Sequence, residues 1–544
     1  MASTLYLPDP PALWSFQSVR LDMMMLLFGA SVTIGWIRGS IGVVILCVVK
    51  RFNNQVGSYE NDTKAFTEVI RQQHFHSKDP HAWLSPTMQS LLHSSYYFGG
   101  LLGLITAAPL IRKFRSKRVL TFGLLLNSFG SVLTTLVAAT LPYLTILLLR
   151  ALMGFGSGFL MPCSISLINK WFPASEKNTA VLTIFIGSLL GISGSMLVTP
   201  LMDNLTVVHL PGWMLALTSY GIMGTVLTIV WEKRAAYKPR HSSYVTATEL
   251  DYIRGKRLNR RIFSRNDLRT PLKKILLLPS VIAILLNGFT LSFVNSAATA
   301  YLPIFTRRYA RMDSVWNGIT SSLPFLIQAL AIVAAYSAVN IVQLCEISTT
   351  AVVKGCSVLG TSIASSCIIA LLGIQPSRIF LTTALLCIGM GFLSATIVGS
   401  VISIRAVAPQ YSHLVLTYFD GFAQFAGVLA PIVTQMLSIS EKSMPSRALL
   451  CILAVLLVTG LYFAIFGQGR REIINELFAR RLLEDSTSRG EHRVQSSSGA
   501  PTSIAPPEIR EVDAVFIEGE ASIPLRYDDL SVDFLEDLTS DEEY

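Results

Sequence analysis

Apolar runs of about 20 residues, the length that crosses the roughly 30 Å hydrocarbon core of a bilayer, dominate this chain. Hydrophobic residues make up 51% of its 544 positions and charged residues only 14%. Twelve runs can be read, near 21–49, 87–111, 119–140, 142–168, 179–203, 212–232, 275–305, 315–340, 348–373, 378–404, 411–438 and 447–467, the boundary between the eighth and ninth being the weakest. The sequence therefore predicts an all-α polytopic membrane protein.

Basic residues are concentrated in short segments between these runs, after the second run and after the sixth. Such clusters stay on the cytoplasmic side of a membrane, so we expect both termini in the cytoplasm. The net charge of +10 is explained by this pattern and does not indicate binding to nucleic acid. The seven cysteines show no metal-ligand or paired spacing, so we expect neither a metal site nor a disulfide framework.

Six runs precede a long basic segment and six follow it. This order predicts two six-helix bundles with the fold of the major facilitator superfamily, in which the substrate binds near the midplane between the halves. The expected parts are a cytoplasmic N-terminus (1–20), an N-terminal bundle (21–232), a cytoplasmic connector (233–274), a C-terminal bundle (275–468) and a disordered acidic cytoplasmic tail (469–544).

Arginines inside apolar runs are the strongest functional signal. Arg150 stands among leucines in the fourth run, and Arg38 stands in the first. A charge at this depth costs about 2.5–3.5 kcal/mol, so each arginine is expected to face a cavity or a partner. A guanidinium group binds carboxylate or phosphate through two parallel hydrogen bonds, which favours an anionic substrate. His93 in the second run either senses or carries a proton or only packs between helices against a backbone carbonyl.

Glycines recur at small spacings in two neighbouring runs, at Gly154, Gly156 and Gly158 and again from Gly187 to Gly194. Such spacing is typical of helices that approach each other closely in a membrane. Two acceptor triplets for N-glycosylation begin at Asn61 and Asn204, both in segments predicted to lie outside the cytoplasm.

Short motifs in both halves add a family resemblance. They are Trp83-x-x-Pro86, Arg150 with Gly154, Gly158 and Pro162, Lys170-Trp171-x-Pro173-x-x-Glu176, Thr246-x-x-Glu249, Tyr301-Leu302-Pro303, Ala408-Pro409-x-Tyr411-Ser412 and Phe466-Gly467-x-Gly469. In this order and spacing, over about Trp36 to Gly469, they resemble the anion:cation symporter family of the major facilitator superfamily. That family includes sodium/phosphate cotransporters, sialin and the vesicular glutamate transporters.

The resemblance implies that Arg38, His93 and Arg150 surround the substrate, because the family has an arginine, a histidine and an arginine at these places. Several positions depart from the pattern, and two of them bear on coupling. Ser157 replaces the glutamate of the vesicular glutamate and sialin-type members, and a serine cannot exchange a proton at neutral pH. Asp420 stands where relatives usually carry asparagine; it either takes part in coupling or gating, or only forms hydrogen bonds to a neighbouring helix or loop.

These observations together predict a secondary active transporter of small organic or inorganic anions that works by alternating access. Sodium or a proton would be the coupling ion, and we expect a monomer in the plasma membrane or an endosomal or vesicular membrane. The sequence contains no phosphate-cradling loop or nucleophile elbow, so we expect neither an enzyme nor a cofactor. The alternative is a transport-inactive family member that acts as a membrane receptor or scaffold, and reconstituted uptake distinguishes the two.

Overall fold

The computed structural model describes residues 11–59, 85–137, 143–203, 211–258, 275–310, 313–374, 378–409, 411–438 and 446–470. Regular structure in these ranges is helical. The helices are α1 (Val19–Tyr59), α3 (Pro86–Val137), α4 (Tyr143–Ser157), α5 (Leu160–Trp171), α6 (Lys177–Asp203), α7 (Gly212–Arg234), η2 (Pro239–His241), α8 (Ala247–Leu258), α10 (Pro279–Ala310), α11 (Ser314–Leu344), α12 (Thr349–Gly373), α13 (Ile379–Val407), α14 (Ser412–Ser438) and α15 (Ser446–Phe466).

Helix α3 contains two membrane spans joined by a sharp break. It has 52 residues, more than twice the number that crosses a bilayer. Arg115 interrupts it with a backbone φ of 66°. Tyr96 Oη donates a hydrogen bond to Asn127 Oδ1 at 2.9 Å, although these residues would lie about 46 Å apart in a continuous helix. The second and third predicted spans are thus the two arms of this hairpin. Eleven helices of the described chain are long and apolar enough to span a membrane, when α4 and α5 are counted together as one. Since α3 is one of these eleven and crosses twice, the chain has twelve crossings in its described part.

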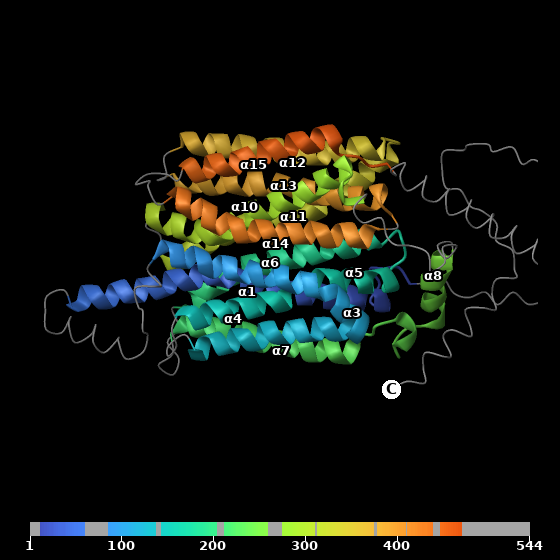
Figure 1. Ribbon diagram of the computed structural model, residues 1–544, viewed down its shortest axis with the longest axis horizontal. Helices are drawn as coiled ribbons and strands as arrows, with labels where there is room; N and C mark the ends of the chain where they lie inside the picture. The colour runs from blue at the N-terminus through green and yellow to red at the C-terminus, as the bar shows by residue number, and fades with distance from the viewer. Residues whose placement is uncertain are drawn as a thin grey trace, which may run out of the picture. The chain divides into compact units, whose positions relative to one another are not determined.

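Two predicted boundaries change. The eighth and ninth spans are separated clearly, since α11 ends at Leu344 and α12 begins at Thr349. The first helix was predicted to end near Val49 and to be followed by a polar loop, which is wrong for the next ten residues: α1 continues to Tyr59. Proline is absent from residues 50–59, so polar residues extend the helix past the apolar run. Figure 1 shows this end of α1 reaching past its neighbours.

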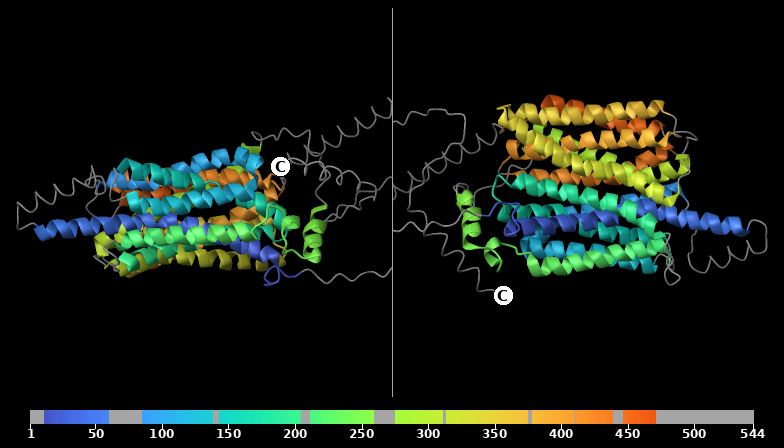
Figure 2. Two further views of the ribbon diagram at one scale, coloured as in Figure 1. Left: turned by 90° about the horizontal axis from the view of Figure 1, so that it is seen from below. Right: turned by 180° about the vertical axis from the view of Figure 1, so that it is seen from behind.

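The helices before α8 and those after it gather on opposite sides of the bundle (Figure 1), and the views in Figure 2 agree. Neighbouring helices of the two groups are joined by hydrogen bonds. Ser94 Oγ of α3 donates to the carbonyl oxygen of Val428 in α14 at 2.8 Å. Ser193 Oγ of α6 donates to the carbonyl oxygen of Ser322 in α11 at 3.1 Å. The two groups therefore meet along α3 with α14 and along α6 with α11.

The start of α1, the connector helix α8 and the turn between α5 and α6 lie at one end of the bundle. Arg20 in the first turn of α1 forms ion pairs with Glu176 of that turn at 2.5 Å and with Glu249 of α8 at 2.9 Å. Arg405 near the end of α13 donates to the carbonyl oxygen of Ala174 in the same turn at 2.7 Å. Which side of the membrane this end faces stays a prediction, namely the cytoplasm.

Candidate functional site

A small cavity of about 130 Å³ lies between the two groups of helices. Its walls come from α1, α3, α4, α5 and α6 on one side and from α10, α13 and α14 on the other. The polar residues that line it are Arg38, Tyr97, Ser157, Ser188, Ser292, Asn295, Asp420 and Gln424. Its volume is below the range of roughly 300–1,000 Å³ that is usual for small-molecule sites, which favours a small ion.

Arg38 lines this cavity from α1. Its Nη2 donates to Ser188 Oγ of α6 at 2.5 Å, and its Cζ lies 5.7 Å from the centroid of the Tyr97 ring. Its Nε is buried and has no hydrogen-bond partner. In the described part of the chain Arg38 forms no ion pair with a carboxylate. The nearest opposite charge acting on it is thus Asp420 of the same cavity, which attracts Arg38 without forming an ion pair.

Arg150 is more deeply buried, with 2% of its surface exposed, and it does not belong to the cavity lining. Its Nη1 donates to the carbonyl oxygen of Ile37 at 3.2 Å, next to Arg38 in the chain. Its Cζ lies 5.1 Å from the centroid of the Tyr96 ring. Its Nε has no hydrogen-bond partner, and no ion pair to a described carboxylate is formed. Arg150 therefore places a second positive charge behind the cavity wall.

His93 lies where α3 crosses α1, and it too is outside the cavity lining. Its side chain is 5% exposed, and Nε2 has no hydrogen-bond partner. The ring packs against Gly42 of α1: a Cβ placed on that glycine would lie 3.6 Å from His93 Cε1. The same Cβ would lie 2.6 Å from the carbonyl oxygen of Thr299 in α10. His93 thus occupies a three-helix crossing, and its contact with a substrate stays a prediction.

Ser157 and Asp420 both line the cavity, from α4 and α14 respectively. Ser157 Oγ donates to the carbonyl oxygen of Gly154 in its own helix at 2.7 Å. Asp420 is partly buried and forms no ion pair with a described basic residue. The cavity wall thus presents one cationic side chain, Arg38, and one acidic side chain, Asp420, that do not contact each other directly.

The predicted glycine contacts bring the helices of the site together. A Cβ placed on Gly154 of α4 would lie 1.9 Å from the carbonyl oxygen of Tyr96 in α3, and one placed on Gly191 of α6 would lie 2.3 Å from that of Val32 in α1. No real side chain fits at such distances, so only glycine permits these approaches. The close packing of α4 on α3 brings Arg150 over the Tyr96 ring, and that of α6 on α1 brings Ser188 within reach of Arg38.

The two groups of helices make contacts on both sides of the cavity. Toward the start of α1, Phe185 of α6 packs edge-on against Phe419 of α14, with ring centroids 6.2 Å apart. Toward the other end of α1, Arg307 Nη1 of α10 donates to the carbonyl oxygen of Leu46 at 3.2 Å. The two groups of helices therefore touch on either side of the cavity.

Sequence reasoning did not single out five polar residues of the cavity, Tyr97, Ser188, Ser292, Asn295 and Gln424. Ser188 carries a weak signal because it follows Gly187 in the glycine-rich stretch of α6, but small polar residues are common in membrane helices. The glycosylation candidates Asn61 and Asn204 lie outside the described residues. Within the described ranges, no group of three or more His, Cys, Asp or Glu side chains is placed to hold a metal ion.

Twelve spans in two groups, with a small polar cavity and buried guanidinium groups between them, define a multi-pass membrane protein of the transporter class. The sequence profile of the Major Facilitator Superfamily matches residues 27–431, well over half of the 544 residues. The chain belongs to the major facilitator superfamily, whose members are membrane transporters.

Relatives support a closer assignment. The chain is 24% identical over 466 residues to sodium-dependent phosphate transport protein 1 of Mus musculus. The matched region covers 85% of this chain and 96% of that protein. It is 23% identical over 462 residues to sodium-dependent phosphate transport protein 3 of Mus musculus, over 84% of this chain and 95% of that protein. These matches confirm the resemblance to the anion:cation symporters. The crystal structure of a D-xylose-proton symporter is similar in fold, with a TM-score of 0.59 and 13% identity over 83% of this chain and 99% of that one.

Proposed function

We propose that this protein is a secondary active transporter of small anions. The observation that carries the proposal is the pair of guanidinium groups, Arg38 and Arg150, which lie between membrane helices without an ion pair to any described carboxylate. A buried charge is costly unless an opposite charge or strong hydrogen bonds offset it. A bound anion would supply both, through charge-assisted hydrogen bonds to the unpaired donors.

The size of the cavity favours a small anion, and inorganic phosphate is the first candidate. A cavity of about 130 Å³ is below the range of roughly 300–1,000 Å³ that is usual for sites of drug-sized ligands. Two relatives are named as phosphate transport proteins. In this proposal Arg38 contacts the anion directly, and Arg150 and His93 shape the wall behind it.

Asp420 is the candidate residue for the coupling ion, either sodium or a proton. It lines the same cavity as Arg38 and is the acidic residue of the lining, whereas Ser157 at the family's usual carboxylate position cannot ionise. A partly buried carboxylate that forms no ion pair would gain from a cation when the anion occupies Arg38. Each net charge moved across the membrane is then worth about 2.3 kcal/mol per 100 mV of potential.

Alternating access would proceed by breaking the contacts between the helix groups at one end of the cavity at a time. Opening at the end near α8 would separate Phe185 from Phe419, and opening at the other end would separate Arg307 from Leu46. The moving bodies would be the bundles 21–232 and 275–468, with the α8 end and both termini in the cytoplasm. The membrane would be the plasma membrane or an endosomal or vesicular membrane.

Counterflow into proteoliposomes tests the proposal. The purified full-length chain would be loaded with unlabelled phosphate, glutamate, sialic acid, urate or a nucleotide, and uptake of the matching labelled anion would be followed. We expect saturable uptake of a small anion and a loss of most of it in Arg38→Leu. Arg234→Leu is the control, because Arg234 is exposed and lies outside the cavity lining, near Asp22 at 3.7 Å and 5.0 Å from the centroid of the Tyr244 ring. Absence of flux for every anion, with binding retained, would instead favour the receptor or scaffold.

A further inference from the structure

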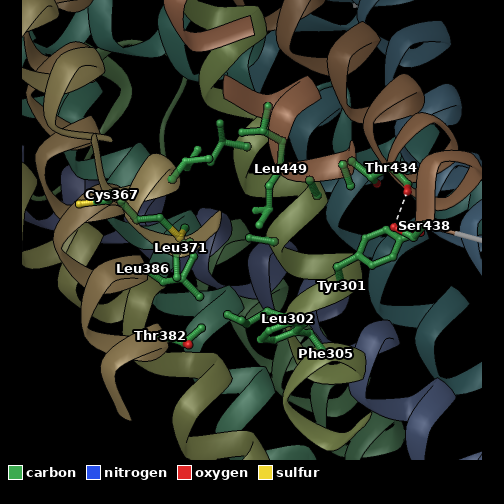
Figure 3. Close-up of a pocket in the computed structure, with 18 of the residues that line it drawn as sticks. Tyr301, Leu302, Phe305, Cys367, Leu371, Thr382, Leu386, Thr434, Ser438 and Leu449 are labelled. Carbon is green, nitrogen blue, oxygen red and sulfur yellow. Dashed lines mark hydrogen bonds between the residues drawn. The ribbon is translucent and has the colours of Figure 1, made fainter. Parts of the chain in front are cut away.

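A second, larger cavity of about 450 Å³ lies among α10, α12, α13, α14 and α15 (Figure 3). Its volume falls within the range of roughly 300–1,000 Å³ that is usual for small-molecule sites. Most of the wall consists of aliphatic side chains, among them Leu302, Leu371, Leu386 and Leu449. Pro86 and Gln89 at the start of α3 complete it, so a molecule in this cavity would contact both groups of helices.

Polar groups occur at two separate places in this wall. On one side, Tyr301 Oη of α10 donates to Gln435 Oε1 of α14, and Ser438 Oγ donates to the carbonyl oxygen of Thr434 at 2.8 Å. On another side lies Thr382 of α13, which Figure 3 shows apart from the Tyr301 group. Thr382 is 2% exposed and its Oγ1 has no hydrogen-bond partner. A buried hydroxyl group without a partner is unfavourable, so a ligand that bonds it would remove an existing cost.

Among the described residues that line this cavity there is no Lys, Arg, His, Asp or Glu. A charged ligand would therefore be desolvated there without a counter-charge, which is strongly unfavourable. The cavity is thus chemically unlike the one at Arg38, and it does not suit the proposed anionic substrate. It suits an uncharged molecule with a mainly apolar body.

We propose that this cavity binds an uncharged amphiphile that has an apolar body and a hydroxyl group, with Thr382 Oγ1 as one of its hydrogen-bond partners. Membranes contain this chemistry in two forms, as monoacylglycerols and as sterols. The described wall contacts fit both, because they require only apolar contact along the body and a hydrogen bond at the hydroxyl group. This binding does not depend on the proposed anion transport.

Photolabelling of the purified full-length chain tests the proposal. A photoreactive monoacylglycerol and a photoreactive cholesterol would be used in parallel, and labelled peptides would be mapped by mass spectrometry. We expect at least one probe to label residues of α10, α13 or α14 that line the cavity, and excess unlabelled compound to abolish the labelling. A photoreactive fatty acid carries the same apolar chain with a negative charge, and it should label these residues at least tenfold less at neutral pH.

Two variants sharpen the test. Ala298→Phe places an aromatic ring in the cavity and should reduce labelling at least tenfold. Thr382→Val removes only the unpaired hydroxyl group and should reduce apparent affinity about three- to tenfold, the effect of one hydrogen bond, while the unliganded protein keeps its stability. The control is Thr396→Val, because Thr396 Oγ1 on the same helix is also buried and unpaired but lies outside the cavity lining.

The Thr396→Val protein should be labelled to the same extent as the unchanged protein. Labelling confined to residues outside the cavity would overturn the proposal. So would equal labelling of the unchanged protein, Thr382→Val and Thr396→Val, and so would equal labelling by the fatty acid probe. If Ala298→Phe does not fold, the comparison of the two threonine variants decides alone, because replacing threonine with valine changes almost no volume.

Discussion

Two regions of this molecule bury arginine in opposite ways. At the α8 end, Arg20 is 1% exposed and forms ion pairs with Glu176 and Glu249, while Ser18 Oγ also donates to Glu249 at 2.9 Å. In the central cavity, Arg38 meets a serine hydroxyl group and a tyrosine ring but forms no ion pair with a described carboxylate. The difference teaches that burial alone does not distinguish the two arginines. What distinguishes them is the ion pair, and we propose that the arginine without one binds the anion.

Replacement of these arginines should therefore affect different properties of the protein. Removal of Arg20 leaves a buried carboxylate without its counter-charge, which harms the folded state. Removal of Arg38 or Arg150 takes away a charge that has no fixed partner, so the fold should tolerate it, and only ligand binding should suffer. Measurements of stability and of transport in such variants thus distinguish the two regions.

The largest effect is expected for Arg20→Met. Glu249 is fully buried, and loss of its partner should cost about 3–5 kcal/mol of folding stability. Thermal unfolding of the purified protein and the yield of folded protein measure this loss. Lys117→Met is the matched control, because Lys117 pairs at 3.2 Å with the half-exposed Glu232 and should matter by less than about 1 kcal/mol. Equal stability of the two variants would contradict the contrast between the regions.

The next effect concerns Arg150. Arg150→Leu should reach the membrane and unfold no more readily than the unchanged protein, because it removes an unpaired buried charge. Anion affinity and transport should fall, but less than in Arg38→Leu, because Arg150 lies behind the cavity wall and attracts the anion without contacting it. Arg150→Lys keeps this positive charge, so it should retain more transport than Arg150→Leu. Normal uptake by well-expressed Arg150→Leu would show that this arginine is structural.

A smaller effect is expected for Asp420→Asn, which removes the negative charge from the cavity that Arg38 lines. Anion binding without the coupling ion should strengthen by on the order of 1 kcal/mol, because a nearby like charge is removed. Uptake should lose its dependence on sodium or on pH, whichever drives the unchanged protein. Uptake measured with a sodium gradient, a pH gradient and a membrane potential in turn checks this. Unaltered coupling in Asp420→Asn would exclude Asp420 from the cation site.

The smallest effect is expected for removal of the residues after Ser488. Their low apolar content predicts that they cannot bury enough surface to fold. Uptake into vesicles by the shortened chain should equal that of the full chain, since the site lies between α1 and α14. A change in the affinity for the anion would show that this segment acts on the site, whereas a change in delivery to the membrane would not.

Hydropathy was sufficient to predict most of the fold, because a membrane span is a run of consecutive apolar residues. The two arms of α3 were separated correctly on either side of the basic cluster near Arg115. The extension of α1 to Tyr59 was missed because a polar helix beyond a span looks like a loop in a hydropathy pattern. The prediction thus failed where a helix continues beyond its apolar run.

The candidate site was predicted less completely. Arg38 and Arg150 were visible because a charge inside an apolar run is conspicuous in sequence. That Arg38 lines the cavity and Arg150 does not depends on the rotation of α1 and α4 about their axes, which sequence alone does not reveal. The pairing of Arg20 with Glu249 joins residues 229 positions apart, and no local pattern predicts it.

The most direct measurement of the central claim is equilibrium binding of the anion found by counterflow to three purified proteins: unchanged, Arg38→Leu and Arg234→Leu. If the unpaired guanidinium group of Arg38 holds the anion, Arg38→Leu should bind it about ten- to a hundredfold more weakly, with no loss of thermal stability. Arg234→Leu should bind as the unchanged protein does. Equal affinity of all three proteins would contradict the claim, and so would a loss of affinity in Arg38→Leu that only accompanies unfolding.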